Sequence, residues 1–166
     1  MIRAELLVRV EQDQAIRREA AERFESGGRL PEEFGKRWHA IDADNTAWIR
    51  GVLELHGWPP RSRIGEEASS ATFLLVQHAD AQPEFQREAL ALLSRAVEAD
   101  EASPKNLAYL TDRVRVAAGD PQVYGTQVRV EAGKAQPYPL EDPDRVDERR
   151  AAVGLGPLSE YLKLFD

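Results

Sequence analysis

The stretch PEEFGKRWHAIDADNTAWIRGVLELH, residues 31–56, decides the fold class of the chain. Large apolar residues recur in it at intervals of three, four and seven, which is the spacing of one face of an α-helix. They are Phe34, Trp38, Ile41, Trp48, Val52 and Leu55. Pro31 is typical of the first turn of a helix, and Gly57 followed by two prolines is a stop signal. The stretch therefore predicts one long amphipathic helix.

The segments on either side also predict helices. The preceding segment is rich in Ala, Glu, Arg and Leu and stops at a Gly-Gly pair. Further on, Ser62 is a candidate N-cap, and Pro83 and Pro104 are candidate first residues. The predicted helices cover residues 3–25, 31–56, 65–80, 83–99 and 104–118, and two short final helices begin near Pro143 and Pro157. Residues 73–76 could instead form a short buried strand, but the Ala-rich approach favours a helix.

One segment near the C-terminal end alternates polar and apolar residues as a β-strand does. Residues 126–131 alternate in this way, with two valines on one face. Gly133 supplies a turn, and residues 135–138 return as a second strand, which Pro137 keeps at an edge. No internal repeat or low-complexity linker divides the chain. The sequence predicts a mainly α single domain, residues 1–166, built as a helical bundle with one small β-hairpin.

Composition excludes several classes of function. The chain has 22 basic and 29 acidic residues, a formal net charge of −7, which argues against a nucleic-acid partner. It contains no cysteine, so disulfides, thiolate nucleophiles and cysteine-ligated metals are excluded. No apolar run approaches the roughly 20 residues of a membrane span, and the N-terminal residues do not resemble a signal peptide. We expect a soluble cytoplasmic protein that does not bind a membrane.

Polar residues interrupt or border the apolar stripes of four predicted helices. They are Asp13, Arg17, Asn45, Gln77, His78, Asp80, Asp112 and Arg113. Burying an unpaired amide or charge costs several kcal/mol, so we expect these side chains to contact one another. Helical bundles build ligand sites from such facing side chains. The pattern therefore predicts one concave, partly buried polar pocket.

Simpler interpretations remain open for single residues. Asp13 and Arg17 could form an ordinary i, i+4 ion pair that stabilises a helix by a few tenths of a kcal/mol. His78 could be a structural core histidine, and Asn45 could cap a neighbouring helix. The chain lacks a histidine pair of the H-x-x-x-H type, a glycine-rich phosphate loop and a G-x-S-x-G nucleophile motif. We therefore expect neither a metal nor a cofactor.

A set of short motifs spans nearly the whole chain. It consists of Asp13-Gln14-x-x-Arg17, Asp42-x-x-Asn45, Gly57-Trp58-Pro59, Ile64-Gly65, Gln77-His78-Ala79-Asp80, Tyr109-Leu110-x-Asp112-Arg113, Gln122-x-Tyr124-Gly125-Thr126-Gln127, Arg149-Arg150 and Gly154-Leu155. With these motifs the chain resembles an uncharacterised bacterial, actinobacterial-type family known only as a domain of unknown function. The resemblance implies a shared fold and a shared polar site, and it adds Tyr124 and Gln127 to the predicted pocket. It implies no particular reaction.

These observations favour a cofactor-independent acid–base enzyme of the hydrolase, lyase or rearrangement type, acting on a small polar molecule. The predicted catalytic residues are His78, Asp112 and Tyr124. His78 would shuttle the proton, because imidazole titrates near neutral pH, and Asp112 or Asp80 would orient it. Arg113 or Arg17 would bind an anionic group. The predicted substrate-binding residues are Asp13, Arg17, Asn45, Gln77, Asp80, Arg113 and Gln127.

Two other functions remain open at this stage. The same polar residues could recognise a small ligand or a partner segment without turning it over, or they could form a structural polar core. The sequence names neither the substrate nor the oligomeric state.

Overall fold

The computed structural model describes residues 1–131 and 134–165. They form two compact units, residues 1–85 and residues 86–165. Helices dominate both units, and the described residues contain a single small sheet. The predicted mainly α fold with one small β-hairpin is confirmed. The single-domain prediction stays a prediction, and the turn predicted at Gly133 lies outside the described residues.

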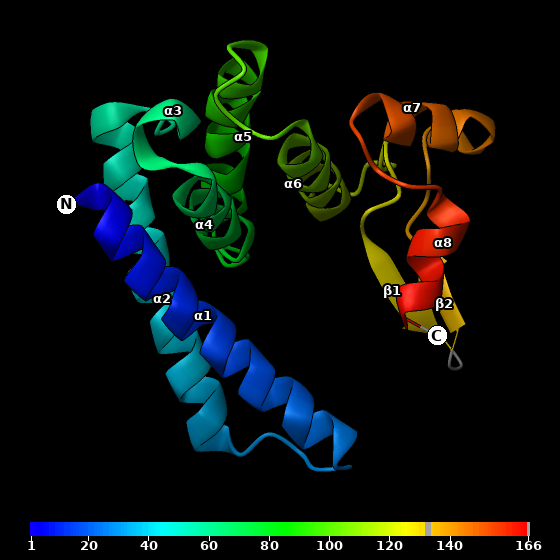
Figure 1. The fold of residues 1–166 in the computed structure, drawn as a ribbon. Coiled ribbons are helices and arrows are strands. Elements are labelled where there is room, and N and C mark those ends of the chain that lie inside the picture. The colour runs from blue at the N-terminus through cyan, green and yellow to red at the C-terminus, as the bar shows by residue number, and fades with distance from the viewer. Residues whose placement is uncertain (132–133, 166) are drawn as a thin grey trace. The chain divides into compact units, whose positions relative to one another are not determined.

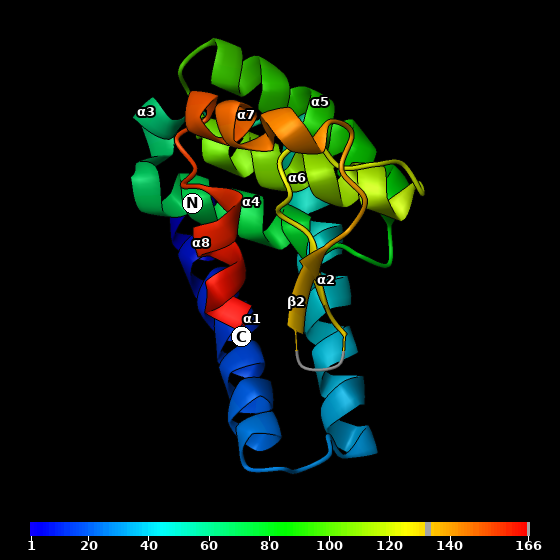
Figure 2. The same ribbon diagram turned by 90° about the vertical axis from the view of Figure 1, so that its right-hand side faces the viewer.

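The first unit is built on a hairpin of two long helices. α1 (Ile2–Glu25) and α2 (Glu32–His56) run side by side in opposite directions, joined by a short loop (Figures 1 and 2). After the single turn α3 (Arg61–Ile64), α4 (Glu66–Gln77) packs against both of them. The long helices are thus held together at one end by α4 and at the other by the connecting loop.

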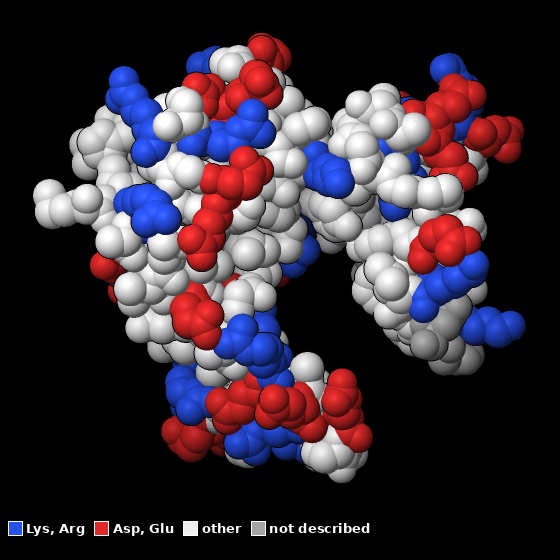
Figure 3. Space-filling model, viewed as in Figure 1, with Lys and Arg blue, Asp and Glu red and all other residues white. Residues whose placement is uncertain are grey.

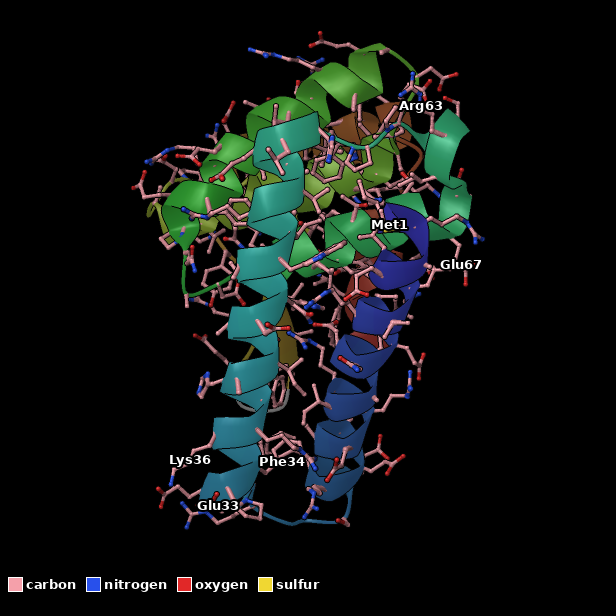
Figure 4. All side chains as sticks on the ribbon, turned by 90° about the vertical axis from the view of Figure 1, so that its left-hand side faces the viewer. Met1, Glu33, Phe34, Lys36, Arg63 and Glu67 are labelled. Atoms are coloured by element: carbon pink, nitrogen blue, oxygen red, sulfur yellow. The ribbon has the colours of Figure 1, made fainter. Side chains whose placement is uncertain are left out.

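Apolar residues fill the space between α1 and α2 near that loop. Ile16 and Ala20 of α1 pack with Phe34 of α2, and Leu30 and Trp38 cover them together with Ile41. Figure 4 shows Phe34 on the side of α2 that faces α1. Phe34, Trp38 and Ile41 of the stretch that starts at Pro31 therefore do face a core, as their spacing predicts, whereas Leu55 at the other end of the same row is 79% exposed.

The third predicted helix differs from the structure at both ends. Ser62 lies inside α3 and is not an N-cap; Gly65, with φ of 81°, occupies the N-cap position of α4. The prolines at 59 and 60 start a separate turn of helix, which ends at Gly65. At the other end α4 stops at Gln77, three residues earlier than predicted, and residues 73–76 are helical.

The second unit combines two helices with a loop-rich C-terminal part. α5 (Pro83–Glu98) begins in the first unit and continues into the second, and α6 (Pro104–Ala117) follows with Pro104 as its first residue. β1 (Val128–Glu131) pairs antiparallel with β2 (Lys134–Pro137), so that Val128 lies opposite Pro137. The chain ends in η1 (Pro143–Arg145), α7 (Val146–Ala152), α8 (Leu158–Leu162) and η2 (Lys163–Phe165).

Charges of both signs are mixed on the surface of the first unit. At the loop end of the α1–α2 hairpin, blue and red side chains alternate in Figure 3. Glu19 of α1 accepts hydrogen bonds there from Arg23 on its own helix and from Arg37 on α2. Among the described helices none is both long and apolar enough to cross a membrane.

Candidate functional site

A buried carboxylate and a histidine meet where α1 passes the end of α4. His78 is the first residue after α4, and its amide N–H still donates to the carbonyl of Leu74 at 3.0 Å. Its Nδ1 lies 3.0 Å from Oδ1 and 2.9 Å from Oδ2 of Asp13, which projects from the middle of α1. The side chain of Asp13 is 1% exposed and that of His78 is 12% exposed. We refer to these two residues as the Asp13–His78 pair.

The pair fixes which ring nitrogen of His78 carries hydrogen. A carboxylate only accepts hydrogen bonds, so Nδ1 must donate and therefore holds a hydrogen. In the neutral imidazole Nε2 is then the nitrogen with the free lone pair. Nε2 makes no hydrogen bond to any residue in the described part of the chain. The geometry thus presents an oriented proton acceptor.

Neighbours on α1 hold the carboxylate of Asp13. Nη1 of Arg17 lies 2.7 Å from Oδ1, and Nε2 of Gln14 donates to Oδ2 at 2.8 Å. Nη2 of Arg17 also donates to Oδ1 of Asp42 on α2 at 3.1 Å. The guanidinium of Arg17 lies 5.3 Å from the ring centroid of Trp38. Arg17 therefore neutralises the buried charge of Asp13 and ties it to α2.

A second polar group lies further along α1 and α2. Asn45 of α2 is 3% exposed, and its Oδ1 accepts a hydrogen bond from Nη1 of Arg9 at 3.1 Å. Arg9 also pairs with Asp44 at 2.6 Å and stacks on the ring of Trp48. The Nδ2 of Asn45 is buried and has no hydrogen-bond partner among the described residues. A buried donor without an acceptor costs about 1–3 kcal/mol, so this amide is suited to a bound acceptor.

These two sets of polar contacts lie along one strip of the two long helices. We call it the polar seam; its members are Arg9, Asp13 and Arg17 of α1 and Asp42, Asp44 and Asn45 of α2. His78 joins the seam at Asp13.

In the second unit, the carboxylate of Asp112 organises the loop that follows α6. Asp112 is fully buried, and its oxygens accept the amide N–H groups of Val123, Tyr124 and Thr126 at 2.7–3.0 Å. The hydroxyl of Thr126 donates to the same carboxylate at 2.9 Å. These four donors occupy the lone pairs of the carboxylate, which favours a positioning role for Asp112.

The half-buried Arg149 and the buried Arg150 and Gln122 hold the same loop through its main chain. Arg149 donates to the carbonyl of Val123 at 2.8 Å, and Arg150 donates to that of Tyr124 at 2.8 Å. Gln122 bridges the loop to the start of the hairpin, since its amide donates to the carbonyls of Gln127 and Tyr138. Main-chain atoms of this loop are thus fixed at nearly every residue.

The side chains that this loop presents are half-buried. The amide oxygen of Gln127 accepts a hydrogen bond from Nη1 of Arg113 at 3.2 Å. Burial, followed by the negative charge of Asp112, raises the pKa of Tyr124 above its ordinary value, while Arg149 acts in the opposite direction. The phenol of Tyr124 therefore stays neutral at physiological pH and can act only as an uncharged group.

The structure places the predicted site residues in two groups. Asp13, Arg17 and His78 contact one another in the first unit, Asn45 lies further along the same seam, and Gln77 and Asp80 flank His78 in sequence at the end of α4. Asp112, Arg113, Tyr124 and Gln127 belong to the second unit. That both groups line one pocket stays a prediction.

The carboxylate that orients His78 differs from the expected one. The sequence predicted Asp112 or Asp80 beside His78, whereas Asp13 occupies that position. Sequence reasoning also left out residues that hold the two groups in place. These are Gln14, Asp42, Gln122, Thr126, Arg149 and Arg150. Each lies within one of the short motifs that carry the family resemblance, and this was the only feature of the sequence that pointed to them.

The described residues contain no cluster of three histidine or carboxylate side chains that could hold a metal ion.

Comparison with known proteins yields a family but no activity. The model of a family of unknown function, DUF6624, matches residues 1–166. Neither a curated protein nor a solved structure matches the chain.

Proposed function

We propose that this chain, which belongs to the DUF6624 family of unknown function, is a cofactor-independent acid–base enzyme. It would act on a small polar molecule by hydrolysis, elimination or rearrangement. The observation that carries this proposal is the Asp13–His78 pair, in which a fully buried carboxylate lies 2.9 Å from Nδ1 and leaves Nε2 without a partner among the described residues.

The arrangement suits proton transfer in both directions. Nε2 of His78 would take a proton from water or from the substrate, and the imidazolium formed would be stabilised by Asp13. The same proton would then pass from Nε2 to the leaving group or to the rearranged product, which regenerates the neutral ring. Arg17, whose Nη1 lies 2.7 Å from Oδ1 of Asp13, would hold that carboxylate in place throughout.

Arg17 acts in this proposal as a positioning residue. One of its terminal nitrogens pairs with Asp13 and the other with Asp42, so few donors remain for a substrate anion.

One observation favours the alternative of a binding module without catalysis. The buried Nδ2 of Asn45 has no acceptor within the described chain and could hold a carbonyl or carboxylate of a ligand. In that case the polar seam would recognise a ligand, and His78 would contribute a hydrogen bond and no proton transfer.

The test compares purified wild type with His78→Gln on panels of small esters, amides, lactones and hydroxy acids. If His78 shuttles protons, turnover of any compound that wild type converts falls by about 10²–10⁴-fold in the variant while the fold is retained. A binding module predicts a loss of affinity of about 1–3 kcal/mol and no turnover in either protein.

His39→Gln is the matched control. His39 is exposed on α2, so this variant should keep wild-type turnover. Full turnover by His78→Gln would contradict the proposed role of His78. Nitrogen-15 NMR of the imidazoles gives a second readout that needs no substrate, because it reports whether hydrogen resides on Nδ1 of His78.

Three further inferences rest on composition or resemblance. The excess of acidic over basic residues supports a small molecule over a nucleic acid as the partner. The bacterial origin and the cytoplasmic location remain proposals.

A further inference from the structure

A cavity of about 300 Å³ lies entirely within the second unit. Lys105 and Tyr109 of α6 line it, together with Arg150 of α7, the turn of residues 154–157, and Glu160 and Tyr161 of α8. A cavity of this size is at the lower end of ligand sites, so it suits a ligand of few atoms.

Arg150 is a buried cation that has no counter-ion among the described residues. The residue is 2% exposed, its Nε donates to the carbonyl of Gly156 at 2.6 Å, and its Nη1 donates to that of Tyr124 at 2.8 Å. The guanidinium lies 5.0 Å from the ring centroid of Tyr161. No carboxylate in the described chain pairs with it, and Nη2 makes no hydrogen bond there.

The nearby buried carboxylate of Asp112 forms no ion pair with this guanidinium. Asp112 accepts the amide N–H of Tyr124, and Arg150 donates to the carbonyl of the same residue. A guanidinium cannot release its proton, and a buried charge is costly without a partner of opposite sign. The second unit therefore contains a positive charge that an anion could neutralise.

The rim of the cavity adds a second cation. Lys105 is exposed and forms no ion pair within the described residues, and its Cε lies 3.2 Å from where a Cβ on Gly154 would stand. Its side chain therefore runs along the turn that lines the cavity. Glu160, which is the only carboxylate among the described lining residues, already pairs with Lys163 at 2.7 Å.

We infer that this cavity binds a phosphate group, either as the free ion or on a small organic molecule. Two cations that have no counter-ion among the described residues match a phosphate group, which carries a charge of about −1.5 to −2 at pH 7, better than a singly charged carboxylate. Nη2 of Arg150 and Nζ of Lys105 supply separate donors for its oxygens. The inference uses residues of the second unit alone and does not depend on the Asp13–His78 pair.

The experiment is a calorimetric titration of the full-length protein with inorganic phosphate and with glycerol phosphate, at constant ionic strength set with chloride. Wild type binds phosphate. Lys105→Gln weakens binding about tenfold, as expected for the loss of a charge-assisted contact. Glu160→Gln strengthens binding several-fold, because it removes the negative charge on the cavity wall. Both residues are exposed, so the variants should fold, unlike variants of Arg150.

Lys36→Gln is the control for general electrostatics. Lys36 is an exposed lysine of α2 in the first unit, so this variant has the same change in net charge and should bind phosphate like wild type. Binding of glycerol phosphate as well as phosphate would identify a group carried on an organic molecule, and binding of phosphate alone would identify the free ion. Equal affinity in wild type, Lys105→Gln and Lys36→Gln, or equal binding of acetate, would overturn the assignment.

Discussion

Asp13 keeps a negative charge where solvent does not reach, and three neighbouring side chains explain how. Arg17 supplies the counter-charge, while Gln14 and His78 supply hydrogen-bond donors. Because Arg17 already neutralises Asp13, a neutral imidazole can occupy the remaining side of the carboxylate. At the scale of single residues, the seam thus meets the requirement that a buried charge be both paired and hydrogen-bonded.

Asp13→Asn should destabilise the fold by about 1.5–3 kcal/mol, because Arg17 and His78 lose a charged acceptor in a buried position. Urea unfolding measures this change. Asp44→Asn is the matched variant; it removes the carboxylate of an ion pair whose acidic side chain is 73% exposed, so it should cost at most about 1 kcal/mol. Equal costs for the two variants would show that the Asp13–His78 pair adds nothing to stability.

The raised pKa of Tyr161 predicts how the stability of the fold responds to alkaline pH. Burial first, and then neighbouring Tyr109, raises the pKa of Tyr161 far above its ordinary value of 10.0. The folded protein therefore keeps a proton that the unfolded chain releases above about pH 10, so the free energy of unfolding falls as pH rises beyond that point. Tyr124, whose pKa is also raised, acts in the same direction.

Tyr161→Phe removes the largest part of this dependence. At neutral pH the variant loses the hydrogen bond to the carbonyl of Thr126, which costs about 1 kcal/mol. Above pH 10 its stability should decline less steeply than that of wild type, and the double variant with Tyr124→Phe should decline least. Urea unfolding between pH 8 and 11 measures the slopes; parallel curves for all three proteins would contradict the argument.

At the scale of elements, the loop between α6 and β1 is pressed closely against α8 at Gly125. Gly125 has φ of +69°, and a Cβ added there would lie 2.9 Å from Cδ1 of Leu158 in α8. Both the backbone conformation and the close approach of α8 therefore require glycine. This position lets the loop reach Asp112 on one side while α8 covers the other.

Gly125→Ala should lower the free energy of unfolding more than Gly119→Ala does. The difference between the two variants measures the effect of the contact with α8. Gly119 also has a positive φ, of +82°, but a Cβ there would meet nothing within 4 Å. Gly119→Ala should thus cost only the left-handed conformation, about 1–2 kcal/mol, and Gly125→Ala should cost that amount plus the displacement of Leu158. Thermal or urea unfolding of the two variants tests this, and a smaller loss for Gly125→Ala would refute it.

Helices that depend on local residues could be predicted from the sequence, whereas features that depend on contacts between distant residues could not. Periodicity and Pro or Gly signals predicted α1, α2, α5 and α6, because these depend on residues within one segment. The strand predicted from Thr126 starts instead at Val128, because Asp112 and Gln122 take the amide N–H groups of residues 126 and 127. Spacing placed Asp13 and His78 on buried faces, but 65 residues separate them, and no local pattern identifies such a partner.

At the scale of the whole molecule, the tryptophans and the tyrosines are divided between the two units. All three tryptophans, Trp38, Trp48 and Trp58, lie in the first unit, and all four tyrosines lie in the second. Tryptophan fluorescence therefore reports the unfolding of residues 1–85, and tyrosine absorbance reports that of residues 86–165. The boundary between the units falls inside α5, near its start.

We expect the two signals to change together in urea. A helix forms cooperatively, and α5 belongs to both units, so unfolding one unit removes the support for part of the other. Coincident midpoints would agree with the predicted single domain. Midpoints separated by more than the fitting error would show two folding units joined by a helix.

The polar seam also has a consequence for how the α1–α2 hairpin assembles. Apolar side chains tolerate a slide of one helix along another, since most contacts are replaced by similar ones. Arg9 with Asn45 and Arg17 with Asp42 do not, because a shift by one helical turn of about 5.4 Å separates both pairs at once. The half-buried carboxylate of Asp42 would then lose its cation, and the buried amide oxygen of Asn45 would lose its donor. The seam therefore favours the native register of α1 against α2 over registers shifted by one turn, between which the apolar core alone would discriminate less.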